Sequence, residues 1–544
     1  MKLFIVLLTG AFMLATGTSD VFAKKKEKVQ TEAKSDTVRT ASKKRNTQYP
    51  RLFKNKRVVT KKGLITIHKI DDKLYFEFPK SLLGREFLMG SSISATSDNT
   101  SGLVGQTMTT PLHIRFAIQE DQVYMQNVTP VSRMDVYSNQ SDISKAVAKS
   151  NITPDMESFK IAAYNMDSTA VVFEVTKFFL ADNKRLPLFD QNSSSLEDEK
   201  YGQLELKAVL KKNLSSIRNF YVFDDNLEIN LDMSFYQSLL ASKKEVRGGN
   251  VRVKAVYSML LLPEETMVWR LGDPRLGYTF TKKQKISTEK DGTAFSYLQH
   301  KWNLLPADEE AYRRGDLVAP RKPVVFYIDS DFPEAWKKAI KEGVNWWNEA
   351  FKMAGFKDAV QTADFPANDT TFYAGNLKYS CIRYVPVNLS KTQSKVWVDP
   401  RSGEIINGTI FVGHDIAKTI ASQRFVQTAQ VDERMRGIQL SEEVLLEGIR
   451  LYVAREVGHC LGLADNASAS AAFSVESLRS PEFTRQNGIA SSVMDELPYN
   501  YIAQPQDGKA ISSKISWELM TCLRFRWDIC SFRMRRHQKK SVKR

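Results

Sequence analysis

Residues 455–465 read Arg-Glu-Val-Gly-His-Cys-Leu-Gly-Leu-Ala-Asp, and no other segment of the 544-residue chain limits the possible fold as strongly. They close a predicted long helix that begins after Ser441, a residue type that favours the N-cap, and that has an acidic first turn. Positions 455 and 459 are four residues apart and share one face of that helix. Gly462 then lets the chain leave the helix sharply, which brings Asp465 back towards the same face.

Several segments elsewhere in the chain support the same interpretation. They are Pro79-Lys80-Ser81-Leu82-Leu83-Gly84, Ala311-Tyr312-Arg313-Arg314-Gly315, Trp397 to Asn407, Ser492-Val493-Met494-Asp495 and Asn500-Tyr501-Ile502-Ala503-Gln504-Pro505. Together with residues 455–465 they resemble the large secreted bacterial zinc-dependent metalloproteases, in which two poorly characterised β-rich domains precede a metzincin-type domain. The resemblance covers residues 50–508.

The resemblance implies a zinc cofactor, peptide-bond hydrolysis and a protein or peptide substrate. In the family motif three histidines bind the zinc ion, and a glutamate takes a proton from the zinc-bound water. The metal positions fall on Arg455, His459 and Asp465, and the catalytic base falls on Glu456. Met494 falls at the methionine turn that lies beneath the metal. The residues that bind the substrate are unknown from the sequence.

Two of the three metal positions depart from the family pattern. Aspartate at 465 is an acceptable zinc ligand, whereas the guanidinium of Arg455 stays protonated and puts a positive charge where the cation should bind. We therefore expect less than one zinc ion per chain and impaired or absent activity. If another ligand is recruited, His414, which follows a predicted strand ending at Val412, is the first candidate.

The same two substitutions suggest what fills the site. A guanidinium binds a carboxylate through two parallel hydrogen bonds, so we hypothesise an Arg455–Asp465 ion pair in place of the metal, with or without Glu456. Removing one partner of a completely buried pair costs about 3–5 kcal/mol. The sequence therefore predicts that Arg455→Ala and Asp465→Ala clearly destabilise the protease domain.

The rest of the chain predicts an α+β protein with β-rich N-terminal modules and a metzincin-like α+β domain. The predicted parts are a signal peptide (1–23), a disordered basic leader (24–49), a small β module (50–100), a β-rich domain (101–303), a linker (304–323), the protease domain (324–508) and an atypical basic tail (509–544). Asp71-Asp72 separates two strands of a predicted hairpin, Leu64–His68 and Leu74–Phe78. A turn is predicted at Gly248-Gly249-Asn250, before a strand at Val251–Leu262.

The charge distribution argues against a nucleic-acid partner. The formal net charge is +16, but residues 24–57 hold 13 Lys/Arg against 3 Asp/Glu and residues 509–544 hold 11 against 2. The excess positive charge therefore sits on the predicted tails, and no basic face on folded structure is indicated. The four cysteines (Cys381, Cys460, Cys522 and Cys530) do not form a disulfide framework, and Cys460 is interpreted as a small buried residue of the motif helix.

The N-terminus predicts export. Lys2, the apolar stretch Leu3 to Leu14 and small residues before a cleavage position after Ala23 are typical of a secretory signal peptide, and the apolar stretch is too short to span a bilayer. The protein is therefore expected in the periplasm, at the cell surface or outside the cell, with peripheral or no membrane association. Its oligomeric state is unknown.

Two alternatives remain beside an impaired protease. One is a non-catalytic protein that uses the cleft to hold an extended peptide along its edge strand, which needs no metal. The other is a decayed gene product, since the change of composition after Gly508 is typical of either a reading-frame shift or a divergent tail. The remaining histidines, His68, His113 and His300, lie on predicted β or linker segments outside the catalytic region and are interpreted as structural.

Overall fold

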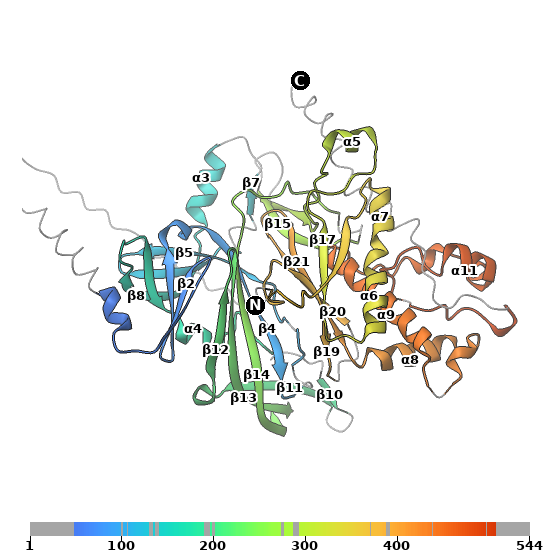
Figure 1. Cartoon of the computed structure of the whole chain (residues 1–544), viewed down its shortest axis with the longest axis horizontal. Helices are drawn as coiled ribbons and strands as arrows, with labels where there is room; N and C mark the ends of the chain where they lie inside the picture. The colour runs from blue at the N-terminus through green and yellow to red at the C-terminus, as the bar shows by residue number, and fades with distance from the viewer. Residues whose placement is uncertain are drawn as a thin grey trace, which may run out of the picture.

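The computed structural model describes residues 48–507, except 99–101, 106, 130–133, 137–140, 190–195, 199–201, 274–276, 287–292, 370–371, 388–391, 438 and 497. Strands from the N-terminal half lie beside a helix-rich C-terminal half (Figure 1). The predicted signal peptide, most of the predicted leader, and the tail from residue 509 with Cys522 and Cys530 lie outside the described residues. Within them, no helix is long and apolar enough to cross a membrane.

The predicted N-terminal hairpin is confirmed. Strand β2 (Thr66–Ile70) pairs antiparallel with β3 (Lys73–Pro79), and Asp71 in the turn between them has a φ of 53°. A short helix at residues 48–53 precedes the hairpin. Alternate side chains of these strands enter the N-terminal hydrophobic core, as period-two burial requires.

Most of the N-terminal half forms one antiparallel sheet, 13-stranded within the described residues, in the order β1-β2-β3-β9-β8-β6-β5-β4-β14-β13-β11-β10 with β12 beside β13. The remaining strands are β1 (Val58–Lys62), β4 (Glu86–Thr96), β5 (Leu112–Gln119), β6 (Gln122–Asn127), β8 (Asp155–Tyr164), β9 (Ala170–Glu174), β10 (Leu196–Asp198), β11 (Gly202–Leu210), β12 (Ser216–Val222), β13 (Asn226–Ala241) and β14 (Lys244–Leu261). A smaller sheet has the order β16-β15-β7, from β7 (Met134–Val136), β15 (Phe280–Ile286) and β16 (Thr293–Gln299).

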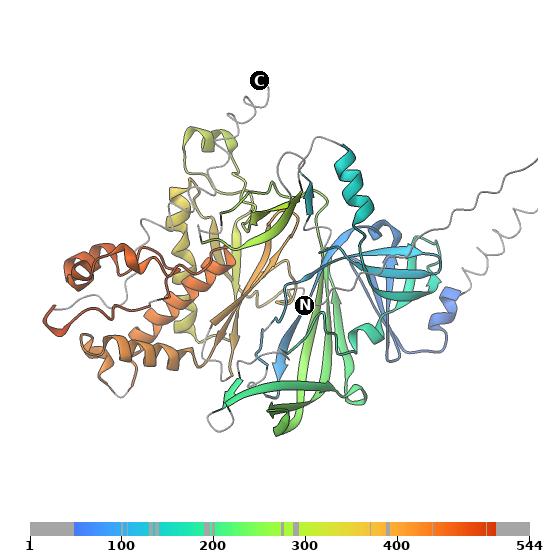
Figure 2. The ribbon, with the colours of Figure 1, turned by 180° about the vertical axis from the view of Figure 1, so that it is seen from behind.

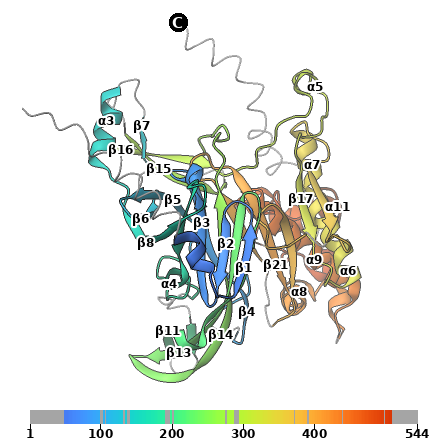
Figure 3. The ribbon, with the colours of Figure 1, turned by 60° about the vertical axis from the view of Figure 1, so that its left-hand side comes forward.

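The two predicted β modules share the large sheet. Strand β3 pairs with β9, and β4 pairs with both β5 and β14, so backbone hydrogen bonds cross the predicted boundary at residue 100. Seen from another side, the long hairpin β13–β14 curves along the lower part of this half (Figure 3). The predicted boundary at residue 100 therefore separates two segments of the sequence that belong to one continuous sheet.

One predicted turn is wrong. Gly248-Gly249-Asn250 lies inside β14, paired with residues of β13. The hairpin turns instead at Ser242 and Lys243, which have φ values of 48° and 67°. Positive φ at two successive residues gives the twist that a tight hairpin needs, and neither side chain signals it in the sequence.

The C-terminal half contains a five-stranded sheet in the order β18-β17-β19-β21-β20. Its strands are β17 (Val324–Ile328), β18 (Val360–Asp364), β19 (Ser380–Val385), β20 (Thr392–Val398) and β21 (Ile405–Gly413). All neighbours are parallel except β20, which runs antiparallel to β21 at the sheet edge. One face is covered by helices α6 (Glu334–Asn345) and α9 (Glu442–Cys460), which also pack on each other.

The other helices are short or peripheral. They are α3 (Ser141–Ser150), α4 (Thr176–Phe179), α5 (Glu309–Arg314), α7 (Trp347–Met353), α8 (Ile416–Thr428), α10 (Val475–Arg479) and α11 (Pro481–Asn487). Seen from behind, the orange and red helices lie on the far side of the five-stranded sheet from the blue and green strands (Figure 2). The structure is α+β, with a β-rich N-terminal region and helices towards the C-terminus, as the sequence predicted.

Candidate functional site

Helix α9 carries the motif residues, and its start is the predicted one. Ser441 is the N-cap, its side chain accepts a hydrogen bond from the Val444 backbone N–H, and two glutamates occupy the first turn. The helix ends at Cys460, and Gly462 has a φ of 95°. A Cβ atom at Gly462 would lie 2.4 Å from the carbonyl oxygen of His300, so both the backbone angle and the space require glycine here.

The turn after α9 is supported by a segment from the N-terminal half. The Ala464 N–H donates to the Gly277 carbonyl at 2.9 Å, and the Thr279 N–H donates to the Gly462 carbonyl at 2.9 Å. The Trp302 indole N–H donates to the Cys460 carbonyl at 2.8 Å. These contacts fix the path of the chain from the helix end towards Asp465.

His300 lies against this turn, which corrects its predicted place outside the catalytic region. Its role is nevertheless structural, because its ring nitrogens lie 3.0 Å and 2.9 Å from the hydroxyls of Thr279 and Thr281. Burial lowers the pKa of His300 to about 4, so the ring is neutral over the physiological range.

The predicted Arg455–Asp465 ion pair forms, but through one hydrogen bond and not the two parallel ones expected. Nη2 of Arg455 donates a hydrogen bond to Oδ1 of Asp465 at 2.6 Å. The same Oδ1 lies 3.3 Å from Nε2 of His459. The His459 Nδ1 faces the Leu463 carbonyl at 3.0 Å and donates to it, which fixes the ring orientation. Arg455 and His459 therefore both approach the same carboxylate oxygen of Asp465.

Glu456 is not part of this cluster. Its side chain is 7 % exposed, and its Oε1 accepts a hydrogen bond from the Thr392 hydroxyl at 3.0 Å. Thr392 is the first residue of β20, so the candidate base is held by the edge strand. The sequence did not reveal this partner, because Thr392 lies outside the segment Trp397 to Asn407 and carries no motif of its own.

Met494 lies beneath the motif helix. A Cβ atom at Gly458 would come within 2.3 Å of the Met494 Sδ and 2.8 Å of the Trp347 ring, so only glycine allows this packing. The Met494 carbonyl accepts a hydrogen bond from the Asn466 N–H at 2.8 Å, which ties the segment just after Asp465 to the residues around Met494.

His414 does not complete a metal site. Its Nδ1 lies 2.6 Å from the Tyr384 hydroxyl, and its ring stacks on Trp336 with a centroid distance of 5.9 Å. Across the part of the chain that the structure describes, no group of three or more His, Cys, Asp or Glu side chains is arranged to hold a metal ion. The residues present therefore do not fit a catalytic zinc ion, since a cation already occupies Asp465 and one imidazole is left.

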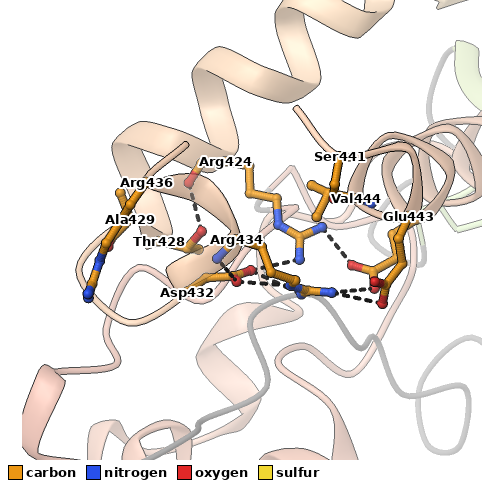
Figure 4. A network of polar contacts seen from close by, with 10 residues as sticks. Arg424, Thr428, Ala429, Asp432, Arg434, Arg436, Ser441, Glu443 and Val444 are labelled. Carbon is orange, nitrogen blue, oxygen red and sulfur yellow. Dashed lines mark hydrogen bonds and ion pairs between the residues drawn. The ribbon is translucent and has the colours of Figure 1, made fainter. Parts of the chain in front are cut away.

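Further towards its N-terminus, α9 is held by a second group of ion pairs, around Arg424 of α8 (Figure 4). The Arg424 guanidinium is completely buried and contacts Asp432 at 2.9 Å and Glu447 at 2.6 Å. Arg434 contacts Asp432 at 3.0 Å and Glu447 at 3.0 Å. Burial alone would raise the pKa of Asp432, but hydrogen bonds from Arg434 and Arg424 outweigh it and lower this pKa to about 2.

Cys460 is interpreted correctly as a buried residue. It is a free cysteine, fully buried, and its Sγ would lie 3.0 Å from a Cβ atom at Gly408 of β21. Burial raises the pKa of its thiol well above the usual range, so the group stays protonated and unreactive. It packs the motif helix against the sheet.

Comparison with known families agrees with this architecture. A family model described as Met-zincin matches residues 437–516, and models of two domains of unknown function, DUF5118 and DUF5117, match residues 47–96 and 105–307. The chain thus carries a metzincin-type domain preceded by two N-terminal domains of unknown function. The Met-zincin match continues past Gly508 into the tail, further than the resemblance seen in the sequence. No curated protein matches the chain, and no solved structure does.

Proposed function

We propose that this chain is a metallopeptidase homologue whose metal site is closed by an ion pair, so that it lacks zinc-dependent peptidase activity. One observation carries the proposal: Arg455 and His459 both approach Asp465 Oδ1, at 2.6 Å and 3.3 Å. A guanidinium stays charged at any physiological pH, so it repels a dication and neutralises the carboxylate that would bind it. The Met-zincin match supports descent from a metallopeptidase family, and the ion pair at the metal positions supports the loss of the zinc site.

Zinc content tests this proposal. We expect the dialysed protein to hold clearly less than one zinc ion per chain by elemental analysis. The double variant Arg455→His with Asp465→His should gain zinc affinity, because it restores three imidazoles at the motif spacing. Lys357→His, at an exposed position, is the matched control and should gain none. One tightly held zinc ion per unmodified chain would contradict the proposal.

A peptidase assay gives a second test. The unmodified chain should not cleave a peptide library above background. If cleavage is seen, Glu456→Gln should abolish it, because no other carboxylate in the motif lies between the two metal positions. Cleavage that persists in that variant would identify a contaminating protease or a different active site.

A second candidate function is binding of an extended peptide. Strand β20 forms one edge of the five-stranded sheet within the described residues, and Thr392 ties it to the motif helix through Glu456. An unpaired strand edge offers main-chain groups to a partner strand, and such pairing needs no metal. Immobilised protein should retain extended peptides, and N-methylation of alternate peptide amides should reduce retention in one register. Equal retention of every N-methylated form would contradict strand pairing.

Export also remains a proposal, supported by the predicted signal peptide at residues 1–23. N-terminal sequencing of the protein recovered outside the cytoplasm should begin at Lys24, and an unprocessed Met1 would contradict it. A gene product without selected function would show neither zinc binding nor peptide retention. The DNA around codons 455 and 508, read for a frameshift, separates that case from a divergent tail.

A further inference from the structure

A cavity lies between the large N-terminal sheet and the five-stranded sheet. Its volume is about 330 Å³, and strands β4, β13 and β14 line one side while β19, β20 and β21 line the other. Side chains alternate along β20, so Thr392 points to Glu456 on the α9 side whereas Lys395 and Trp397 face the cavity. The cavity is therefore separate from the motif site, on the opposite face of the same strand.

Three charged side chains line this cavity. Glu228 from β13 is buried and accepts hydrogen bonds from Tyr373 and Asn230. Lys395 is surrounded by protein and lines the cavity. Its Nζ lies 5.2 Å from the centre of the Trp397 ring. Arg383 lines the cavity from β19 and forms no hydrogen bond or ion pair with another side chain of the described residues. Two cations thus face one carboxylate.

Burial acts on these groups as expected for desolvated charges. It raises the pKa of Glu228, although Arg383 and Lys395 favour the ionised form. It lowers the pKa of Lys395 to about 8. An additional anion would stabilise the charged form of Lys395 and provide Arg383 with a partner.

The rest of the lining combines apolar side chains with polar ones such as Ser92, Asn230 and Thr409. The apolar side chains include Ile93, Val256, Leu377, Val385, Trp397 and Phe411. A cavity of this size, lined by both apolar side chains and convergent polar groups, has the properties of a small-molecule site. A dianion such as phosphate suits the cavity less well. Glu228 repels a second negative charge, and a phosphate has no apolar part that could pack on the apolar side chains of the lining.

We propose that this cavity binds a small monocarboxylate with an apolar body, whose carboxylate contacts Arg383 and Lys395 and whose body packs on the apolar side chains of the lining. The site goes beyond the proposed loss of zinc chemistry and does not depend on it, since no residue of the motif lines the cavity.

Calorimetry and thermal unfolding of the full chain with phenylacetate, indole-3-acetate and hexanoate test the proposal. At least one should bind and raise the melting temperature, while its neutral amide should not. Lys395→Met and Arg383→Gln should each weaken binding roughly tenfold or more, as loss of a charge-assisted hydrogen bond implies. Lys357→Met, at an exposed position, should leave binding unchanged.

Several outcomes would overturn the site. They are no binding of any of the three carboxylates, equal binding of the acid and its amide, or inorganic phosphate binding as tightly as the carboxylates. Circular dichroism confirms that each variant is folded. If Lys395→Met does not fold, Lys395→Gln gives the same test, because it removes the charge but keeps a polar side chain. Zinc content should not change in any of these variants, which keeps this test independent of the closed metal site.

Discussion

Two arginine–carboxylate pairs hold helix α9, and they differ mainly in exposure. Arg424 is 0 % exposed and its partner Asp432 is 8 % exposed, whereas Arg455 is 26 % exposed and Asp465 is 46 % exposed. Arg424 has a second carboxylate, Glu447, whereas among the described residues only Asp465 lies within ion-pair distance of Arg455. The same chemistry therefore gives a buried structural element at Arg424 and a part-exposed ion pair at Arg455.

We expect this difference in solvent exposure to set how much each ion pair contributes to stability. A buried ion that loses its partner keeps the full cost of leaving water, while a part-exposed ion regains hydration. The sequence predicts that loss of either partner at the metal positions clearly destabilises the protease domain, on the assumption that the pair is at least partly buried. Its exposure predicts instead a small contribution to stability.

The largest effect is expected for Arg424→Met. The variant should lose up to about 3–5 kcal/mol of unfolding free energy, because Asp432 and Glu447 lose their buried partner and keep only the part-exposed Arg434. Urea denaturation measures it. Arg450→Met is the matched control, since its pair with Glu342 is part-exposed, and it should lose about 1 kcal/mol or less. Equal losses would remove the distinction by burial.

Acidification should produce the next largest effect. The pKa of Asp432 is lowered to about 2 in the folded chain, while an unfolded aspartate titrates near about 3.9. Its contribution to stability is therefore complete above the unfolded value and is lost as the pH falls through the folded value. Denaturation midpoints should drop between about pH 4 and pH 2, and Asp432→Asn should flatten this part of the profile. An unchanged slope in that variant would assign the acid sensitivity to other carboxylates.

A smaller effect is expected for Arg455→Ala. The pair it breaks is part-exposed, so the loss should be about 1 kcal/mol or less, well below the cost first expected from the sequence. Asp465→Ala should behave similarly. A loss as large as that of Arg424→Met would show that the pair at the metal positions acts as a buried structural element after all.

The smallest effect is expected from added salt, which should change how much each arginine stabilises the fold. The Debye length falls to about 3 Å at 1 M salt, so the stabilising contribution of Arg455 should disappear at high ionic strength while that of Arg424 persists. The difference in denaturation midpoint between each variant and the unmodified chain, measured in low and high sodium chloride, gives the answer. Parallel salt responses would contradict the comparison.

The local patterns of the sequence predicted much of this fold. The N-cap at Ser441 and the β2–β3 hairpin lie where their residues indicate, because capping and turn signals are local. At the site, the Arg455–Asp465 contact followed from helical periodicity and the glycine turn.

The long-range contacts could not be predicted in this way. Nothing in the sequence near β4 shows that it pairs with β14, and nothing near His300 shows that its carbonyl lies against Gly462. Thr392 is a single polar residue in a polar segment, so its hydrogen bond to Glu456 becomes visible only once the sheet is assembled. Such contacts depend on tertiary packing rather than on residue type.

The shared sheet has a consequence for synthesis of the chain. Strands β3 and β4 emerge from the ribosome early, but their neighbours β9 and β14 come much later in the sequence. Until then each strand has an unpaired edge and an apolar face, and pairing of this long-range kind is slow. The N-terminal residues must wait for most of the large sheet to be translated, so a nascent chain stalled near residue 200 should be a preferred chaperone client.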